Sequence, residues 1–233
     1  MLKLKDVEYE DKNSQLGRKI LDGVTLDFNA ETLTVITGPN GSGKSTLAEI
    51  MMGIKKPTAG EIRFCEKDVT RESTTEHAKL GMAYAFQTPV KFKGITVYDI
   101  LNIARGVMMS KDEAGEALRR VGLNAEDYLM REINDKLSGG ELKRIEIAGV
   151  LARDAKLMIF DEPEAGIDIW SFSNLEDILL GLKKEGRTLI VISHQARILE
   201  IADEIVILDR GAVKAKGVRE EMLARLKEGY EAI

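Results

Sequence analysis

The amino-acid sequence predicts an α/β fold, and two observations carry this prediction. First, "AKLMIFDEP" and "RTLIVISH" are nearly continuous apolar runs, which are typical of parallel strands buried on both faces. Second, segments with helical 3.6-residue periodicity lie between and after these runs and complete βαβ units. Because residues 88–153 are helical in pattern and interrupt this alternation, we expect one domain, 1–233, with a core of residues 1–87 and 154–233 and an inserted helical lobe.

The expected elements follow one another in a clear order. "LKLKDVEYE" and "ILDGVTLDFNAETLTVITG" alternate apolar and polar positions and are predicted strands. A helix is expected over about residues 44–52, then a strand in "KKPTAGEIRF" and a short buried strand in "LGMAYAF". The inserted lobe should contain helices in "TVYDILNIARGVMM", "KDEAGEALRRVG" and "GGELKRIEIAGVLARD". "EIVILDRGAVKAKG" predicts a closing hairpin, and "VREEMLARLKEG" predicts a final helix.

The composition is that of a globular protein, with 44% hydrophobic and 31% charged residues among 233. The formal net charge of −5 does not favour nucleic acid as a partner. The single cysteine, Cys65, cannot form an internal disulfide, and we expect it to be buried as a small apolar side chain. The first residues lack the apolar stretch of a signal peptide, and no apolar run approaches the ~18 residues of a membrane span. We therefore expect a soluble, cytoplasmic chain.

The segment "GPNGSGKST" predicts a nucleotide site. It fits the pattern G-x-x-x-x-G-K-[ST], follows the predicted strand "LTVIT" and opens a helix, which is the context that this motif requires. Its glycines let backbone N–H groups surround a phosphate chain, and the helix dipole adds positive potential. Lys44 is expected to reach the β- and γ-phosphates, and the Ser45 hydroxyl to bind Mg²⁺. The expected nucleotide contacts are Gly38, Pro39, Asn40, Gly41, Ser42, Gly43, Lys44, Ser45 and Thr46.

Two acidic residues and a histidine end the buried strands that follow. Asp161 and Glu162 come at the carboxyl end of "LMIF", and His194 ends "TLIVIS", at the edge where α/β sheets place their ligands. Asp161 is expected to hold Mg²⁺ through a water. Glu162 could accept a proton from an attacking water or orient it, and His194 could donate a hydrogen bond near the γ-phosphate. The other histidine, His77, has no such neighbours, and we expect it at the surface.

The stretch "DKLSGGELKRIEIAGVLARD" predicts a helix with an unusual first turn. Ser138 is a good capping residue, but Gly139 and Gly140 follow it, at a cost of roughly 0.5–1 kcal/mol each within a helix. A plain capped helix with Glu141 near its start is one interpretation. The other is that bare N–H groups, a serine hydroxyl and the positive helix end form a phosphate site, provided that something else holds the phosphate.

Taken together, these motifs resemble the ATP-binding cassette (ABC) ATPases. "GPNGSGKST", a glutamine after a strand (Gln87), "LSGGE", "MIFDEP", "GID" and a strand-end histidine occur in the order seen in that family, over essentially the whole chain. The resemblance implies a P-loop NTPase (RecA-like) core with an antiparallel β subdomain and an inserted α-helical subdomain. It also implies hydrolysis of ATP with Mg²⁺, with Lys44, Gln87, Glu162 and His194 as the catalytic residues.

The resemblance further implies that two copies share their sites. In the family two cassettes stack head to tail on ATP, so the residues acting in trans on the partner copy's nucleotide would be Ser138, Gly139, Gly140 and Asp168. Gln87 would sense the γ-phosphate and contribute to the Mg²⁺ site with Ser45 and Asp161. Tyr9, near the first strand, would stack on the adenine ring.

One branch of the family, the SufC ATPases of iron–sulfur cluster assembly, is particularly similar. The runs "TPVKFKGITV", "LSGGELKRIEI" and "GIDIWSFSNL" carry this likeness. It implies a soluble scaffold of the SufB or SufD kind as partner, docked on roughly "TPVKFKGITVYDILNIARG". Two alternatives stay open: the nucleotide-binding subunit of a transporter with a separate membrane permease, and a module that uses ATP only as a dimerisation ligand, against which Glu162 argues.

Overall fold

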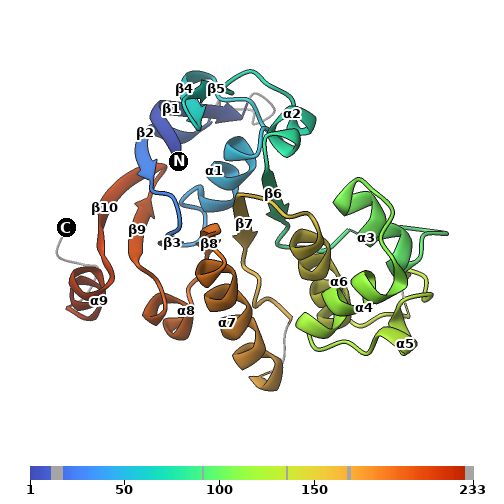
Figure 1. The fold of residues 1–233 in the computed structure, drawn as a ribbon. Helices are drawn as coiled ribbons and strands as arrows, with labels where there is room; N and C mark the ends of the chain where they lie inside the picture. The colour runs from blue at the N-terminus through green and yellow to red at the C-terminus, as the bar shows by residue number, and fades with distance from the viewer. Residues whose placement is uncertain (12–17, 91, 135, 167–168, 229–233) are drawn as a thin grey trace.

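A six-stranded sheet forms the centre of the structure (Figure 1). The computed structural model describes residues 1–11, 18–90, 92–134, 136–166 and 169–228. The strands lie in the order β10-β9-β3-β8-β7-β6, and neighbouring strands pair in parallel except for β10 and β9. The strands are β3 (Leu33–Thr37), β6 (Met82–Ala85), β7 (Leu157–Asp161), β8 (Thr188–Ile192), β9 (Glu204–Asp209) and β10 (Ala212–Val218). The predicted closing hairpin is therefore confirmed as β9 and β10.

A second, four-stranded sheet is antiparallel and has the order β2-β1-β4-β5. Its strands are β1 (Leu2–Asp11), β2 (Arg18–Phe28), β4 (Ala59–Phe64) and β5 (Lys67–Asp68). One buried cluster joins Leu4 and Ile62 of this sheet to Ile50 of helix α1 (Lys44–Met51) and to Ile159 of the six-stranded sheet. Helix α1 thus packs between the two sheets (Figure 1), and the antiparallel β subdomain implied by the resemblance is confirmed.

Apart from α2 (Thr74–Lys79), whose Ala78 packs against the cluster that contains α1, the remaining helices lie on the opposite face of the six-stranded sheet or beyond its β6 edge. Helices α7 (Ile169–Lys184), α8 (Ala196–Glu200) and α9 (Arg219–Lys227) share one buried cluster with β7, β8 and β9. Between β6 and β7 the chain forms α3 (Val97–Arg105), α4 (Lys111–Arg120), α5 (Ala125–Tyr128) and α6 (Gly139–Ala152), on the right of Figure 1. We keep residues 88 and 153 as the proposed limits of a helical lobe.

Short polar side chains determine where these inserted helices begin. In each of α3, α4 and α6 the side chain of the residue before the helix accepts a hydrogen bond from the third helical N–H. The acid at that third position accepts a hydrogen bond from the N–H of the residue before the helix. The pairs are Thr96 with Asp99, Ser110 with Glu113, and Ser138 with Glu141. Among the described residues, no helix has both the length and the apolar character needed to span a bilayer.

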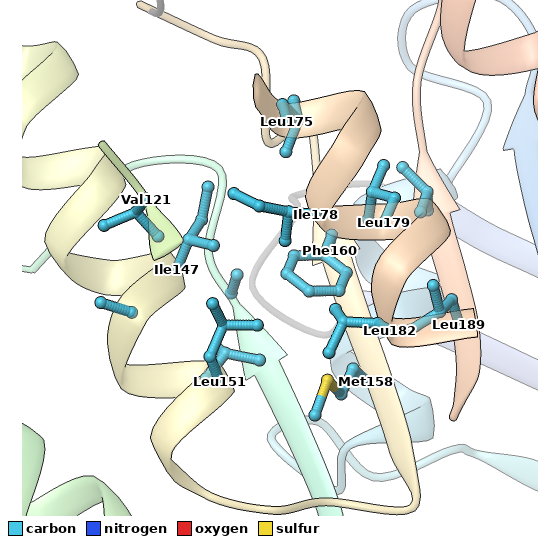
Figure 2. Packing of buried hydrophobic residues seen from close by; sticks show 14 of the residues in the cluster. Val121, Ile147, Leu151, Met158, Phe160, Leu175, Ile178, Leu179, Leu182 and Leu189 are labelled. Atoms are coloured by element: carbon cyan, nitrogen blue, oxygen red, sulfur yellow. The ribbon is translucent and has the colours of Figure 1, made fainter. Parts of the chain in front are cut away.

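The alternation of side chains along β7 explains why its sequence is apolar throughout. Met158 and Phe160 point to one face of the sheet and join the cluster that contains α6 and α7. Leu157 and Ile159 point to the other face and join the cluster that contains α1. Figure 2 shows Phe160 surrounded by apolar side chains of α6 and α7. A strand buried on both faces has no position for a polar residue until its carboxyl end.

Two expectations about single residues are wrong. Cys65 is exposed, because Cys65 and Glu66 form the two-residue turn between β4 and β5 with φ values of 49° and 66°. His77 is 1% exposed, and its ring nitrogens lie 3.1 Å from Met51 O and 2.9 Å from Val69 O. His77 belongs to α2 (Thr74–Lys79), a short helix that the sequence pattern did not predict.

We predict that Leu179→Ala lowers the free energy of unfolding by about 2–5 kcal/mol, because Leu179 is fully buried in the cluster of Figure 2. Urea denaturation measures this loss. Ile103→Ala is the control, since the Ile103 side chain is 61% exposed and its loss should change stability by no more than about 0.5 kcal/mol. Equal losses for the two variants would contradict the assigned packing.

Candidate nucleotide site

The loop between β3 and α1 is pressed against neighbouring backbone, and its glycines are required there. At Gly38 (φ 137°) an added Cβ would lie 1.9 Å from the carbonyl oxygen of Leu208 on β9. At Gly43 (φ 100°), the residue before α1, a Cβ would lie 2.8 Å from the Leu21 side chain. Because only glycine adopts these backbone angles without strain and leaves this space, the loop keeps its N–H groups close to whatever binds in front of α1.

Lys44 begins α1 and is held inside the loop that precedes it. Its side-chain ammonium donates hydrogen bonds to Gly38 O at 2.9 Å and to Pro39 O at 3.0 Å, and the residue is 6% exposed. Burial lowers the pKa of Lys44, while Glu162 and Asp161 raise it. The loop therefore carries a cation whose present partners are neutral carbonyls, which phosphate oxygens could replace.

Asp161 ends β7 and receives two hydroxyl hydrogen bonds. Ser45 Oγ donates to Asp161 Oδ1 at 3.2 Å, and the Tyr84 hydroxyl donates to Oδ2 at 2.9 Å. Asp161 is 2% exposed, and this burial raises its pKa, while the bonds from Tyr84 and Ser45 lower it. Burial and the neighbouring carboxylate raise the pKa of Tyr84.

The oxygen atoms of Ser45 and Asp161 suit a magnesium ion. Mg²⁺ prefers hard oxygen ligands and is commonly held by one or two carboxylates together with substrate phosphates. Within the described ranges, no group of three or more His, Cys, Asp or Glu side chains could hold a metal ion without such help. The residues present therefore fit an ion that arrives with the nucleotide.

Glu162, Gln87 and His194 form a cluster beside this loop. Gln87 Nε2 donates to Glu162 Oε2 at 2.7 Å, and His194 Nε2 lies 3.9 Å from Glu162 Oε1. Glu162 has a positive φ of 45°, and its N–H donates to Ile192 O at 3.0 Å, so β8 holds this strained residue in place. Burial and Lys44 lower the pKa of His194, while Glu162 raises it.

An open cleft of about 1290 Å³ brings these groups together. Its lining contains the loop residues from Pro39 to Thr46 with Gln87, Glu162 and His194. The cleft also takes in residues that the sequence did not single out, namely Asp11, Lys19, Ile20, Asp209 and Arg210. Tyr9 is not among the lining residues: its ring packs against the cluster between the two sheets and faces the Lys55 ammonium at 5.7 Å. Stacking of Tyr9 on adenine stays a prediction that these contacts do not support.

The first turn of α6 lies apart from the lining of this cleft. Ser138 and Gly139 are exposed, and a Cβ added at Gly139 would meet nothing within 4 Å. A Cβ added at Gly140 would lie 3.0 Å from Gly166 O, so the chain's own packing explains why that residue is small. Asp168, the fourth residue expected to act in trans, lies outside the described residues.

Glu141 fixes the geometry of this helix tip, which we define as Ser138, Gly139 and Gly140. Its carboxylate accepts hydrogen bonds from the Ser138 N–H at 2.6 Å and from the Tyr128 hydroxyl. The Arg131 guanidinium also donates to it, at 3.3 Å. The bond from Tyr128, followed by that from the Ser138 N–H, lowers the pKa of Glu141 to about 2. These contacts therefore hold the Ser138 backbone and keep the Glu141 side chain behind it ionised.

Tyr84 is a further residue near the site that the sequence did not single out. It lies on β6, and pairing of β6 with β7 brings its hydroxyl to Asp161. A tyrosine within the otherwise apolar strand "MAYA" was the available signal, because a partly buried phenol needs a hydrogen-bond partner.

Comparison with known proteins agrees with this geometry. A family profile described as "ABC transporter" matches residues 21–165. An uncharacterized ABC transporter ATP-binding protein of Methanocaldococcus jannaschii is 39% identical over 230 residues, covering 95% of this chain and 90% of that protein. A probable branched-chain amino acid transport ATP-binding protein of Archaeoglobus fulgidus is 33% identical, covering 89% and 86%. A solved ATP-binding cassette, a dimer in a post-hydrolysis state bound to ADP and phosphate, is 26% identical with a TM-score of 0.85 and covers 94% of this chain and 99% of its own.

We predict that Tyr84→Phe weakens binding of Mn²⁺, used in place of Mg²⁺, by about tenfold or more in the presence of a non-hydrolysable ATP analogue. The reason is that Asp161 loses one of the two hydroxyls that orient it. Electron paramagnetic resonance measures the free Mn²⁺. Tyr98→Phe is the control, since it removes a hydroxyl bonded to Met109 O instead. Unchanged Mn²⁺ affinity in Tyr84→Phe would show that the hydroxyl does not orient Asp161.

Proposed function

This chain belongs to the ABC transporter family of ATP-binding proteins, and we propose that it closes head to tail with a second copy on ATP and thereby drives a conformational change in a separate partner protein. As a member of this family it is an ATPase, which converts ATP and water to ADP and phosphate with Mg²⁺. A module that only binds ATP is therefore set aside. The roles of individual residues, the second copy and the partner are the proposal.

In the proposed reaction the loop after β3 holds the triphosphate. Lys44 transfers its hydrogen bonds from the Gly38 and Pro39 carbonyls to phosphate oxygens. Ser45 and Asp161 hold Mg²⁺, which neutralises phosphate charge when it is bound. Each exchange replaces a neutral or hydroxyl partner by a charged one, so nucleotide binding strengthens contacts at side chains that the loop already positions.

Glu162 accepts a proton from the attacking water or orients it, and Gln87 and His194 assist. The cluster supports these roles, because Gln87 contacts the Glu162 carboxylate directly and His194 lies beside it. The lowered pKa of His194 favours a neutral imidazole at physiological pH. A neutral imidazole can donate one hydrogen bond to a phosphate oxygen without adding a charge that Lys44 would repel.

The single observation that supports pairing with a second copy is the exposed, side-chain-poor helix tip. Gly139 has neither a left-handed backbone nor a crowded Cβ position, so nothing among the described residues of its own chain requires glycine there. The Ser138 residue is exposed at this tip, and its hydroxyl accepts the Glu141 N–H at 3.2 Å. A serine donor, free N–H groups and a helix amino end suit the γ-phosphate of a nucleotide held by another copy. The dimeric state of the solved relative supports this arrangement.

The partner docks in an apolar groove beside β6. The groove measures about 340 Å³, and Phe86 and Val90, which line it, are 38% and 51% exposed. Further apolar lining comes from α3 and α6 through Ile100, Ala104, Ile145 and Val150. Because the walls are helices and the lining is apolar, the groove suits the apolar side chains of a helix from another protein.

A membrane permease is the partner that the relatives favour, since their names describe transport ATP-binding proteins. A soluble iron–sulfur scaffold of the SufB or SufD kind is the second candidate. One observation favours it: the run "TPVKFKGITV", which resembles the SufC branch, supplies Pro89, Val90 and Phe92 to the groove.

We predict that Glu162→Gln accumulates an ATP-bound dimer, because hydrolysis is blocked while the charge-neutral side chain still occupies the site. Light scattering coupled to gel filtration measures the dimer. Adding Ser138→Arg should return the chain to monomer, whereas Val218→Arg, at a residue 56% exposed at the end of β10, should not. A Glu162→Gln chain that stays monomeric with ATP and still turns over would refute the role of Glu162.

Co-purification of the tagged chain from its native cells tests the partner. We expect a permease in detergent extracts, and Ala104→Arg, which fills the groove, should abolish its recovery. Recovery of a soluble scaffold without detergent, with the same dependence on residue 104, would instead establish the second candidate. A partner that binds Ala104→Arg as well as the unaltered chain would show that the groove is not the docking site.

A further inference from the structure

Helix α6 carries a pair of opposite charges in the protein interior. The Lys143 side chain is 0% exposed and the Glu146 side chain 14% exposed, and Lys143 Nζ lies 3.2 Å from Glu146 Oε2. Burial raises the pKa of Glu146, and the Lys143 ammonium lowers it. Burying such a pair is costly unless further hydrogen bonds satisfy both groups, and two apolar residues would pack as well. The pair therefore needs an explanation beyond packing.

Both charges engage the backbone that follows β6. Glu146 Oε1 accepts the Phe86 N–H at 2.8 Å. Lys143 Nζ donates to Phe86 O, and Gln87 O lies 3.4 Å from it. Two side chains from one turn of α6 thus hold three backbone groups of two consecutive residues. We call Lys143 and Glu146, with these contacts, the α6 clamp.

The clamped segment has few other anchors. The Gln87 side chain is exposed, and Phe86, 38% exposed, makes an edge-to-face contact with Tyr84 at 4.7 Å between ring centroids. The 2.7 Å hydrogen bond from Gln87 Nε2 to Glu162 Oε2 therefore depends on where the backbone is held. Charged hydrogen bonds to backbone groups are stronger than neutral ones and more directional than an exposed ring contact.

The clamp lies between the two functional surfaces of the chain. Phe86 and Glu146 line the apolar groove, whereas Gln87 and Glu162 line the nucleotide cleft. Helix α6 also begins at the helix tip, one turn before Lys143. A movement of α6, or the binding of a partner in the groove, would thus shift the Phe86–Gln87 backbone. Through the Gln87 side chain this shift would change the hydrogen bond to the Glu162 carboxylate.

We infer that Lys143 and Glu146 are positioning residues for ATP hydrolysis: they fix Gln87 against Glu162 and connect the groove and the helix tip to the nucleotide cleft. The inference rests on the proposed roles of Gln87 and Glu162. If the clamp only stabilised the fold, a variant without it that remained stable would hydrolyse ATP at the unaltered rate. If the clamp positions Gln87, the same stable variant would hydrolyse ATP more slowly.

The test replaces the pair with apolar residues of similar size, Lys143→Met with Glu146→Leu. We expect urea stability to be retained, kcat to fall on the order of 10- to 100-fold, and KM for ATP to stay within about threefold. In Gln87→Ala, which has lost the side chain being positioned, adding the same two substitutions should lower kcat by no more than about twofold.

Two results separate failure of the inference from failure of the proposed function. If Gln87→Ala lowers kcat but the apolar pair does not, the clamp is overturned and the role of Gln87 stands. If Gln87→Ala itself leaves kcat unchanged, the proposed role of Gln87 is wrong and the clamp falls with it. Should the apolar pair not fold, Lys143→Met with Glu146→Gln keeps an acceptor for the Phe86 N–H, and unchanged kcat in that variant would equally overturn the clamp.

Discussion

The parallel pairing of β3, β8 and β7 is the constraint on which the rest of the site depends. Ile36 pairs with Ile192, and Ile192 also pairs with Asp161, so the three strands end at the same level. Carboxyl ends of parallel strands share one edge of a sheet, and the loop after β3, the acids after β7 and His194 after β8 therefore meet there. The consequence is a buried carboxylate at Asp161, to which the hydroxyls of β6 and α1 are hydrogen-bonded.

Features that follow from local pattern were predictable from the sequence, and features that follow from tertiary contact were not. The apolar runs predicted β7 and β8, and their positions after strand ends predicted Glu162 and His194 as members of the cleft. Cys65 is exposed because it lies in the turn between β4 and β5. His77 can be buried because its two ring nitrogens contact the backbone carbonyls of Met51 and Val69, which come from other segments of the chain. Tyr84 reaches Asp161 only through the register of β6 on β7, which no single segment reveals.

Helix α6 links parts of the proposed cycle that are far apart in the chain. Its first turn presents the helix tip, its second holds the backbone of Gln87, and its apolar positions wall the groove. A helix moves as a rigid element. A displacement of α6 on closure with a second copy, or on binding of a partner in the groove, would therefore also displace Gln87. In the proposed cycle, α6 would couple the ATPase reaction to the proposed partner directly.

The most direct measurement of the central claim mixes two inactive chains, Lys44→Ala and Ser138→Arg, in equal amounts. In a head-to-tail dimer the intact loop of the second chain meets the intact helix tip of the first, so random pairing should restore about a quarter of the unaltered ATPase rate. If loop and tip served the same chain, every pairing would remain defective. A mixture no faster than the separate variants would contradict the account.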